Sequence, residues 1–192
     1  MGEALTPAGR RTLDAAAELF YTQGIHAVGV DAVASAAGIT KKTLYACFGS
    51  KDRLVAAYLK ERDERWRQWL REQVDEPGGP ARDQILATFD ALAAWAEREN
   101  SRGCGFVNAL AELPAADHPA RAVIAEQKRW MLGYLTGLAA AAGAEPPEAL
   151  GRTLFLLHEG ASVAASIEAV PDAARHARSV AADLVPDGGM TT

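Results

Sequence analysis

The chain has 192 residues, of which 49% are hydrophobic and 23% charged, the composition of an ordinary soluble protein with a sizeable core. Its length admits one large domain or two small ones. No apolar run approaches the roughly 20 residues of a membrane span, and the N-terminus lacks the charged-then-apolar pattern of a signal peptide. We therefore expect a cytoplasmic protein that does not enter a membrane.

The net charge of −5 is distributed unevenly along the chain. Residues 1–60 carry seven Lys or Arg against five Asp or Glu, and the remainder carries 13 against 20. A mildly basic N-terminal part on an acidic body is compatible with a protein that binds specific DNA sites without attaching to DNA indiscriminately. The pattern alone does not establish DNA binding.

Helical signals follow one another from end to end. Thr6-Pro7 is the favoured order for opening a helix, Gly24 ends that helix, and Asp172 is a candidate cap for the last one. No segment shows the strict alternation of a strand. The fold class is predicted as all-α, with about nine helices at 7–23, 30–37, 41–47, 51–73, 81–99, 104–113, 118–142, 147–169 and 173–185.

The long helix predicted at 51–73 is a natural connection between two parts of the chain. The clearest break, Glu76-Pro77-Gly78-Gly79-Pro80, follows it, because two prolines and two glycines cannot continue a helix. We predict an N-terminal domain at 1–50, a helical body at 51–185 and a frayed tail at 186–192.

The segment Ile39 to Phe48 is predicted to be a short helix with one apolar side. Thr40 can cap its N-terminus, Ile39 and Leu44 can pack as a hydrophobic staple, and Leu44 and Phe48 point the same way. The exposed side then carries Lys41, Lys42, Thr43 and Tyr45. Ammonium and hydroxyl groups within one and a half turns suit phosphate oxygens and base edges.

The surroundings of this short helix favour a helix-turn-helix. Gly38 supplies the left-handed residue that ends the preceding helix, and only Gly38, Ile39 and Thr40 separate the two helices. In such a unit the second helix enters the major groove. Ser50 can cap the next helix, so that Lys51 lies in its first turn, where the helix dipole and the ammonium both favour a phosphate.

This order of residues resembles the tetracycline-repressor-like (TetR/AcrR) transcriptional regulators, whose pattern is Ala-Gly-Val-Ser-x-x-Thr-Leu-Tyr-x-x-Phe-x-x-Lys. The chain reads Ala37-Gly38-Ile39-Thr40-Lys41-Lys42-Thr43-Leu44-Tyr45-Ala46-Cys47-Phe48-Gly49-Ser50-Lys51. The resemblance implies a DNA-binding set of Thr40, Lys41, Lys42, Thr43, Tyr45 and Lys51. The chain departs from the family at Cys47, where His or Tyr is frequent, and at Gly29, where Ser or Thr usually caps the second helix.

The resemblance also implies a small-molecule effector in the body. The candidate pocket residues are Phe89, Leu92, Trp95, Phe106, Asn108, Glu112, Met131, Tyr134, Leu154, Leu157 and His158. An alternative for each aromatic residue and Met131 is a place in the core.

Pairing of the last two helices with those of a second copy is likewise implied by the resemblance. The small residues on them are Gly160, Ala161, Ala164, Ala165, Ala173, Ala174, Ala177 and Ala181. A tightly packed pair within one chain explains the same composition.

Metal, thiol and catalytic sites have weaker support. His118, His158, Glu112 and Glu159 lack a metal-ligand spacing, so we expect no metal and no cofactor. Cys47 and Cys104 are expected to stay unpaired in a reducing compartment. Cys47 is a candidate thiol sensor, but a small residue filling a gap is the preferred interpretation because no resolving cysteine is near.

The function predicted from the residues and the resemblance is a homodimeric repressor. A small-molecule effector would release it from a pseudo-palindromic operator in double-stranded DNA. The alternatives are an activator, a DNA-organising protein without an effector, and a small all-helical enzyme, for which the sequence offers only scattered acid–base candidates.

Overall fold

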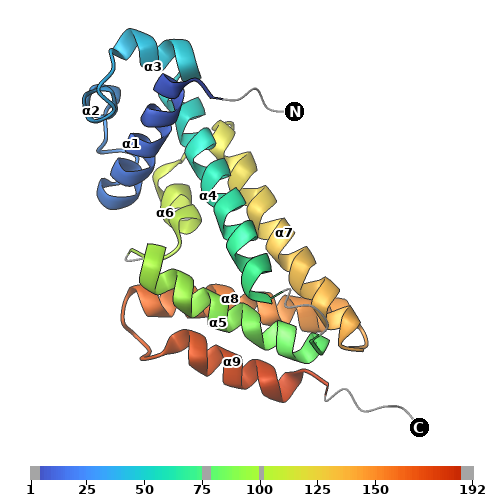
Figure 1. Cartoon of the computed structure of the whole chain (residues 1–192). Helices are drawn as coiled ribbons and strands as arrows, with labels where there is room; N and C mark the ends of the chain where they lie inside the picture. Colours follow the sequence, from blue (N-terminus) through green and yellow to red (C-terminus); the bar gives the residue numbers. More distant parts are fainter. Residues whose placement is uncertain (1–4, 75–78, 100–101, 187–192) are drawn as a thin grey trace. The chain divides into compact units, whose positions relative to one another are not determined.

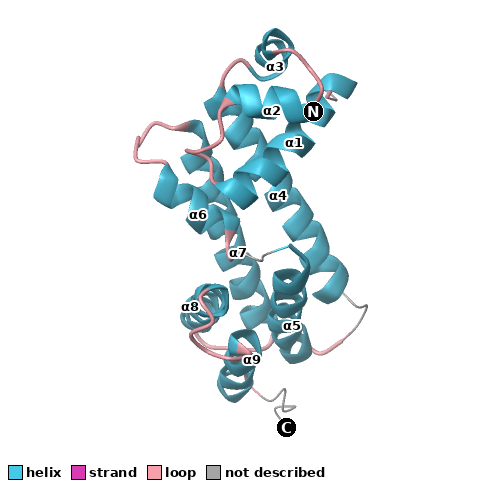
Figure 2. Cartoon of the chain, turned by 90° about the vertical axis from the view of Figure 1, so that its left-hand side faces the viewer, coloured by secondary structure: helices cyan, strands magenta, loops and turns pink. Residues whose placement is uncertain are grey.

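The computed structural model describes residues 5–74, 79–99 and 102–186 and consists there of helices and loops (Figures 1 and 2). The predicted break at 76–78, the start of the loop at 100–101 and the tail from 187 lie outside the described residues. The helices are α1 (Pro7–Gln23), α2 (Val30–Ala36), α3 (Lys41–Phe48), α4 (Lys51–Val74), α5 (Ala81–Glu99), α6 (Gly105–Glu112), α7 (Pro119–Ala141), α8 (Pro147–Ser166) and α9 (Ala173–Leu184). The all-α prediction is confirmed.

The chain divides into two compact units. Unit 1 comprises residues 1–64 and 105–125, and unit 2 comprises residues 65–104 and 126–192. Helices α4 and α7 each contribute residues to both units. This division concerns compactness, whereas the domains predicted at 1–50 and 51–185 concern DNA and effector binding and remain a prediction.

Helix α1 begins and ends where its local sequence predicts. The Oγ1 of Thr6 accepts a hydrogen bond from the backbone N–H of Gly9 at 3.1 Å, and Pro7 occupies the first helical position. The helix ends at Gly24, whose φ of 92° suits a residue without a Cβ. Leu13 and Phe20 are buried on the inner side of α1.

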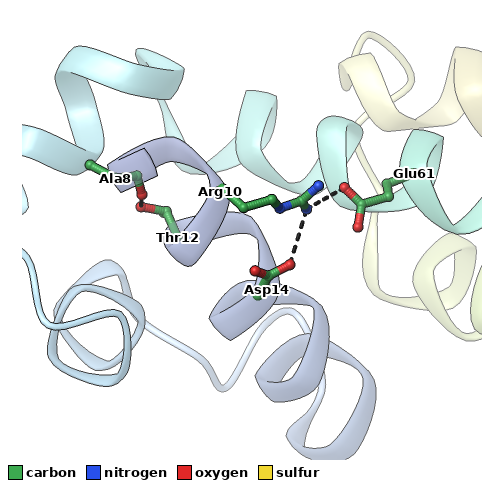
Figure 3. Close-up of polar contacts among 5 residues, drawn as sticks. All are labelled: Ala8, Arg10, Thr12, Asp14 and Glu61. Carbon is green, nitrogen blue, oxygen red and sulfur yellow. Dashed lines mark hydrogen bonds and ion pairs between the residues drawn. The ribbon is translucent and has the colours of Figure 1, made fainter. Parts of the chain in front are cut away.

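An ion-pair group joins α1 to α4 within unit 1. The guanidinium of Arg10 contacts the carboxylate of Glu61 on α4 and, at 3.1 Å, that of Asp14 one turn along α1 (Figure 3). The hydrogen bond to Glu61 is the main cause that raises the pKa of Arg10. The rings of Phe20 on α1 and Tyr58 on α4 lie 5.9 Å apart, so the pair of helices has both a polar and an apolar contact.

Helix α6 contacts the loop between α1 and α2 through the side chain of Glu112. The Oε2 of Glu112 accepts a hydrogen bond at 2.7 Å from the backbone N–H of His26. A Cβ at Gly24 would lie 3.1 Å from the same oxygen, so the loop passes close to the carboxylate. Glu112 therefore satisfies a backbone donor that no helix of the described chain uses.

In unit 2, α9 packs against both α5 and α8. The core of this unit draws its largest buried side chains from α4, α5, α7 and α8, and buried alanines from α9 fill the space beside them. A Cβ at Gly151 of α8 would lie 2.8 Å from the Cα of Thr136 on α7. Only glycine therefore allows α7 and α8 to approach this closely.

Two predictions about the segment between α8 and α9 are wrong. Helix α8 ends at Ser166 rather than 169, because Glu168 adopts a left-handed backbone with φ of 53° and the N–H of Ala169 bonds to the carbonyl of Ala164 at 3.1 Å. Asp172 precedes α9 with φ of 52°, and its side chain makes no capping hydrogen bond. Its carboxylate lies 3.7 Å from the guanidinium of Arg175 instead.

None of the described helices combines the length and the apolarity that crossing a bilayer requires.

The close approach at Gly151 leads to the first testable prediction. Gly151→Ala should lower the free energy of unfolding by about 1–3 kcal/mol, because the added methyl group meets backbone that cannot rotate away. Chemical denaturation followed by circular dichroism measures the change.

Gly133→Ala on α7 is the matched control, since a Cβ there meets nothing within 4 Å. It should be neutral or stabilising by up to about 1 kcal/mol, because alanine favours a helix more than glycine does. Equal effects of the two substitutions would contradict the packing at Gly151.

Candidate functional site

The corner between α2 and α3 has the backbone of a helix-turn-helix. Gly38 has φ of 62°, and the N–H of Ile39 reaches back to the carbonyl of Ala34 at 3.0 Å, which closes the end of α2. A Cβ-bearing residue at Gly38 would be strained by the positive φ. The predicted turn residue is therefore confirmed.

Helix α3 begins at the predicted cap. The Oγ1 of Thr40 accepts a hydrogen bond from the N–H of Thr43 at 3.1 Å, and the two hydroxyl oxygens lie 2.9 Å apart. Leu44 is fully buried and Phe48 is 9% exposed. The apolar side of α3 is thus turned inward, and the opposite side faces solvent.

The predicted DNA-binding residues of α3 lie on or beside this outer side. Lys41, Lys42 and Tyr45 are exposed, and Thr43 is half-buried. Lys41 is not free in the described structure, because its Nζ lies 3.0 Å from a carboxylate oxygen of Asp31 on α2. The hydrogen bond to Asp31 is the main cause that raises the pKa of Lys41.

A second group of candidate DNA contacts opens α4. The Oγ of Ser50 accepts a hydrogen bond from the N–H of Arg53 at 3.1 Å, which confirms the predicted cap. Lys51 is half-buried in the first turn, and the exposed guanidinium of Arg53 lies beside Gly49. Sequence reasoning missed Arg53, although two basic residues within the first turn after a serine cap were a usable signal.

Cys47 lies on α3 near the start of α1. Its Sγ is 3.9 Å from the Oγ1 of Thr6, and the side chain is half-buried. This contact agrees with the interpretation of Cys47 as a residue that fills a gap between helices.

The predicted pocket residues are divided between the two units. Phe106, Asn108 and Glu112 belong to unit 1, where Glu112 bonds to the backbone of His26. The others belong to unit 2, and its core or the side chains packed on that core include Phe89, Leu92, Trp95, Met131, Tyr134, Leu154 and Leu157. The sequence could not predict this division, because it depends on how helices that are distant along the chain pack against one another.

His158 is the polar residue enclosed by this core. It is 4% exposed, and its ring lies 5.9 Å from that of Trp66 and 5.8 Å from that of Phe89. Burial, helped by the positive charge of Lys128, lowers the pKa of His158 to about 3. The imidazole is consequently neutral at any physiological pH.

Lys128 forms the polar contact beside this histidine. Its Nζ lies 2.7 Å from one carboxylate oxygen of Glu159 and 2.8 Å from the other, and it is 3.6 Å from the Sγ of Cys104. No group of three or more His, Cys, Asp or Glu side chains within the described ranges could hold a metal ion.

An open groove of about 670 Å³ adjoins the aromatic core of unit 2. It is lined by α5, the second half of α8 and the segment leading into α9, with Phe89, Leu92, Ala161 and Ala174 among its apolar residues. Carboxylates lie along it at Asp90, Glu97, Glu168 and Asp172.

Helices α8 and α9 also present an apolar face to solvent. Three exposed positions on α8 recur at helical spacing, namely Leu156, Gly160 and Val163, and the exposed Ile167 follows directly after the helix. A shallow hollow of about 250 Å³ lies between the two helices. Of the small residues predicted at a dimer interface, Gly160 is exposed and Ala164 half-buried, but Ala161, Ala177 and Ala181 are buried within the chain.

Comparison with known proteins bears on these surfaces. The profile of the family described as "Bacterial regulatory proteins, tetR family" matches residues 13–58, which contain the helix-turn-helix. The HTH-type transcriptional activator FasR of Mycolicibacterium smegmatis is 34% identical over 92 residues, 46% of this chain and 40% of that protein. The HTH-type transcriptional regulator Rv1255c of Mycobacterium tuberculosis is 29% identical over 152 residues, 68% of this chain and 74% of that one.

Solved structures resemble the whole chain. SCO4454, a TetR-family transcriptional regulator from Streptomyces coelicolor, is 32% identical with a TM-score of 0.85, covering 94% of this chain and 97% of that one. A tetR-type transcriptional regulator from Streptomyces avermitilis is also 32% identical, with a TM-score of 0.76 and coverage of 92% and 98%. NemR of Escherichia coli, at 20% identity and a TM-score of 0.80 over 93% and 98% of the two chains, shares the fold.

The buried histidine leads to a prediction about acid stability. An unfolded chain binds a proton at this histidine below about pH 6.5, whereas the folded protein does not until about pH 3. The free energy of unfolding should therefore fall as the pH is lowered between these values, with a limiting contribution of about 1.4 kcal/mol per pH unit.

His158→Gln removes this titrating group. Urea denaturation from pH 7 to pH 4 should show a shallower decline for the variant than for the wild-type protein. Parallel curves would contradict the neutral state of His158 in the fold.

Proposed function

Because the chain belongs to the TetR family of DNA-binding transcriptional regulators, a non-enzymatic family, we propose that it is a homodimeric repressor that a small-molecule effector releases from its operator. The observation that carries this proposal is the geometry of α3. A helix capped by Thr40 and anchored by the fully buried Leu44 follows directly on the corner at Gly38. Its outer side is left for a major groove.

The candidate DNA-binding side chains of α3 and α4 fall into two groups, those suited to base edges and those suited to phosphates. Lys42 and Thr43 lie in the first turn of α3, where the N-terminal residues of a recognition helix meet base edges. Tyr45 on α3 and Lys51 and Arg53 at the start of α4 suit phosphate oxygens, because they carry a hydroxyl and two cations. Lys41 would exchange its carboxylate partner Asp31 for a phosphate on binding.

The apolar face of α8 and α9 supports a dimer. Leu156 and Ile167 are each 68% exposed, and together with the exposed Val163 they recur at helical spacing rather than being scattered singly. The 250 Å³ hollow, which Leu156 lines, can receive side chains of the same face from a second copy, as a two-fold interface requires. Two recognition helices would then read half-sites about one DNA turn, roughly 34–36 Å, apart.

Control by an effector follows from population shift. The dimer would have two arrangements, one with the recognition helices at operator spacing and one without. A ligand that binds the second arrangement more tightly lowers DNA affinity, by an amount set by the difference between its affinities for the two. Helix α4 is the candidate carrier of the change, because its residues belong to unit 1 up to Glu64 and to unit 2 from Arg65. The groove and aromatic core of unit 2 are the candidate effector site.

Selection of fragments from a random DNA pool tests the proposal. The purified full chain should enrich one pseudo-palindrome, and transcription in vitro from a promoter containing it should fall when the protein is added. Enrichment of no sequence at low ionic strength would refute specific DNA binding. A rise in transcription would identify an activator.

Two lysines should have different effects on DNA affinity. Lys51→Ala should weaken binding to all sequences alike and reduce the slope of log K against log salt by about one, because a single phosphate contact is lost. Lys42→Ala should instead reduce the preference for the operator over other sequences. Fluorescence anisotropy at several salt concentrations separates these effects.

Lys60→Ala provides the control for these variants. Lys60 is exposed on α4 away from its first turn, so its loss should leave both affinity and preference nearly unchanged. A variant at Lys42 or Lys51 that behaves like the control would remove that residue from the proposed interface.

A charge on the apolar face should dissociate the dimer. Leu156→Glu should weaken self-association by a factor of about one hundred or more, because association would bury an unpaired carboxylate. Sedimentation equilibrium measures the change, and circular dichroism checks that the helices persist.

Leu110→Glu is the matched substitution on α6, where Leu110 is 42% exposed. It should leave self-association unaltered. A monomeric wild-type protein, or equal weakening by both variants, would refute an interface at α8 and α9.

A further inference from the structure

The aromatic core of unit 2 contains a hydrogen-bond acceptor that nothing in the described structure uses. His158 is 4% exposed and lies between the rings of Trp66 and Phe89, and Trp66 in turn lies edge-on to Trp95 at 5.5 Å. The Nε2 of His158 is buried and has no hydrogen-bond partner among the described residues. A lone pair without a partner in such surroundings is costly.

The second ring nitrogen determines what this atom can do. The imidazole makes a hydrogen bond to the backbone of Thr88, and this bond favours the protonated form of the ring, so Nδ1–H donates to the carbonyl oxygen. A neutral imidazole carries one N–H only. Nε2 is therefore fixed as an acceptor, and its partner has to be a donor.

Gln127 offers a second acceptor in the same unit. Its side chain is 4% exposed, and its Oε1 is likewise without a partner among the described residues. Gln127 and His158 each precede a member of the Lys128–Glu159 ion pair, which joins α7 to α8 at 2.7 Å. Both unpaired atoms require donors, and neither could serve an anionic ligand.

Charges around the core disfavour ionised ligands of either sign. The ammonium of Lys128 is close enough to His158 to oppose a second positive charge there. The groove beside the core is lined by four carboxylates and one guanidinium, that of Arg175, so its net negative charge opposes an anion on entry. An uncharged molecule meets neither barrier.

Phe89 is the side chain that links the groove to the histidine. Phe89 lines the groove, and its ring is 5.8 Å from that of His158, so this one side chain contacts both. Met131, 1% exposed, belongs to the same core and is the side chain there that most readily changes shape. A flat apolar molecule entering past Phe89 would lie among aromatic rings.

We propose that the effector is an uncharged aromatic molecule bearing a hydroxyl or N–H group, and that this group donates a hydrogen bond to the Nε2 of His158. The inference rests on the proposed effector site in unit 2. It goes further by naming the ligand class and the atom that recognises it.

A set of naphthalene probes tests the ligand class with the full-length protein. 2-Naphthol supplies the donor, 2-methoxynaphthalene has the same rings without it, and 2-naphthoate and 2-naphthylmethylammonium carry the two charges. Tryptophan fluorescence reports binding, because Trp66 and Trp95 lie in the core concerned. The wild-type protein should bind 2-naphthol about tenfold more tightly than the methyl ether, and more tightly than either ion.

Two variants locate the hydrogen bond. His158→Phe keeps an aromatic ring but removes the acceptor, so the tenfold preference should fall to about one. His26→Phe, the same substitution at an exposed position of unit 1, should retain it. The ¹⁵N resonance of the His158 Nε2 in the wild-type protein should also move when 2-naphthol binds. This measurement does not depend on the folding of any variant.

The outcomes separate this inference from the proposed function. Equal affinities for 2-naphthol and its methyl ether, tighter binding of either ion, an unmoved Nε2 resonance or no binding of 2-naphthol would each overturn the inference. Operator binding, measured on the same preparation, is independent of these results. Loss of specific DNA binding alone would refute the proposed repressor.

Discussion

The left-handed backbone at Gly38 is the constraint on which the DNA-binding part of the chain depends. It ends α2, turns the chain within three residues and places Thr40 where its hydroxyl can cap α3. Burial of Leu44 then decides which side of α3 faces inward. The outward direction of Lys42 and Tyr45 is a consequence of that burial rather than of any interaction of their own.

The body of the protein depends on a different constraint, which is how closely its helices approach. Gly151 lets α8 come against α7, and buried alanines of α9 let it fit against both α5 and α8. Small residues are therefore used inside the chain. The burial of Ala161, Ala177 and Ala181 agrees with the alternative of a tightly packed pair within one chain, and the large aliphatic residues of α8 are left outside, where a second copy is proposed to cover them.

The same close packing explains why one histidine has distinctive chemistry. Enclosure of His158 by aromatic rings keeps its imidazole neutral, and the bond to Thr88 decides which nitrogen remains an acceptor. A polar atom of this kind adds little to stability, so its presence is better explained by recognition than by folding. Repression, dimerisation and ligand recognition would then use separate sets of residues in one helical chain.

The sequence by itself determined the helices and the helix-turn-helix, because their signals are local. A threonine or serine cap, a glycine with positive φ and a buried residue every third or fourth position act within one or two turns, as at Thr6, Thr40 and Ser50. Where no glycine marked the end, as at Glu168, the boundary was missed. Only the tertiary structure decided which distant groups meet: Asp31 with Lys41, Glu112 with the backbone of His26, and His158 with Trp66 and Phe89. Contacts across ten or more residues depend on how whole helices pack, and no local pattern carries that information.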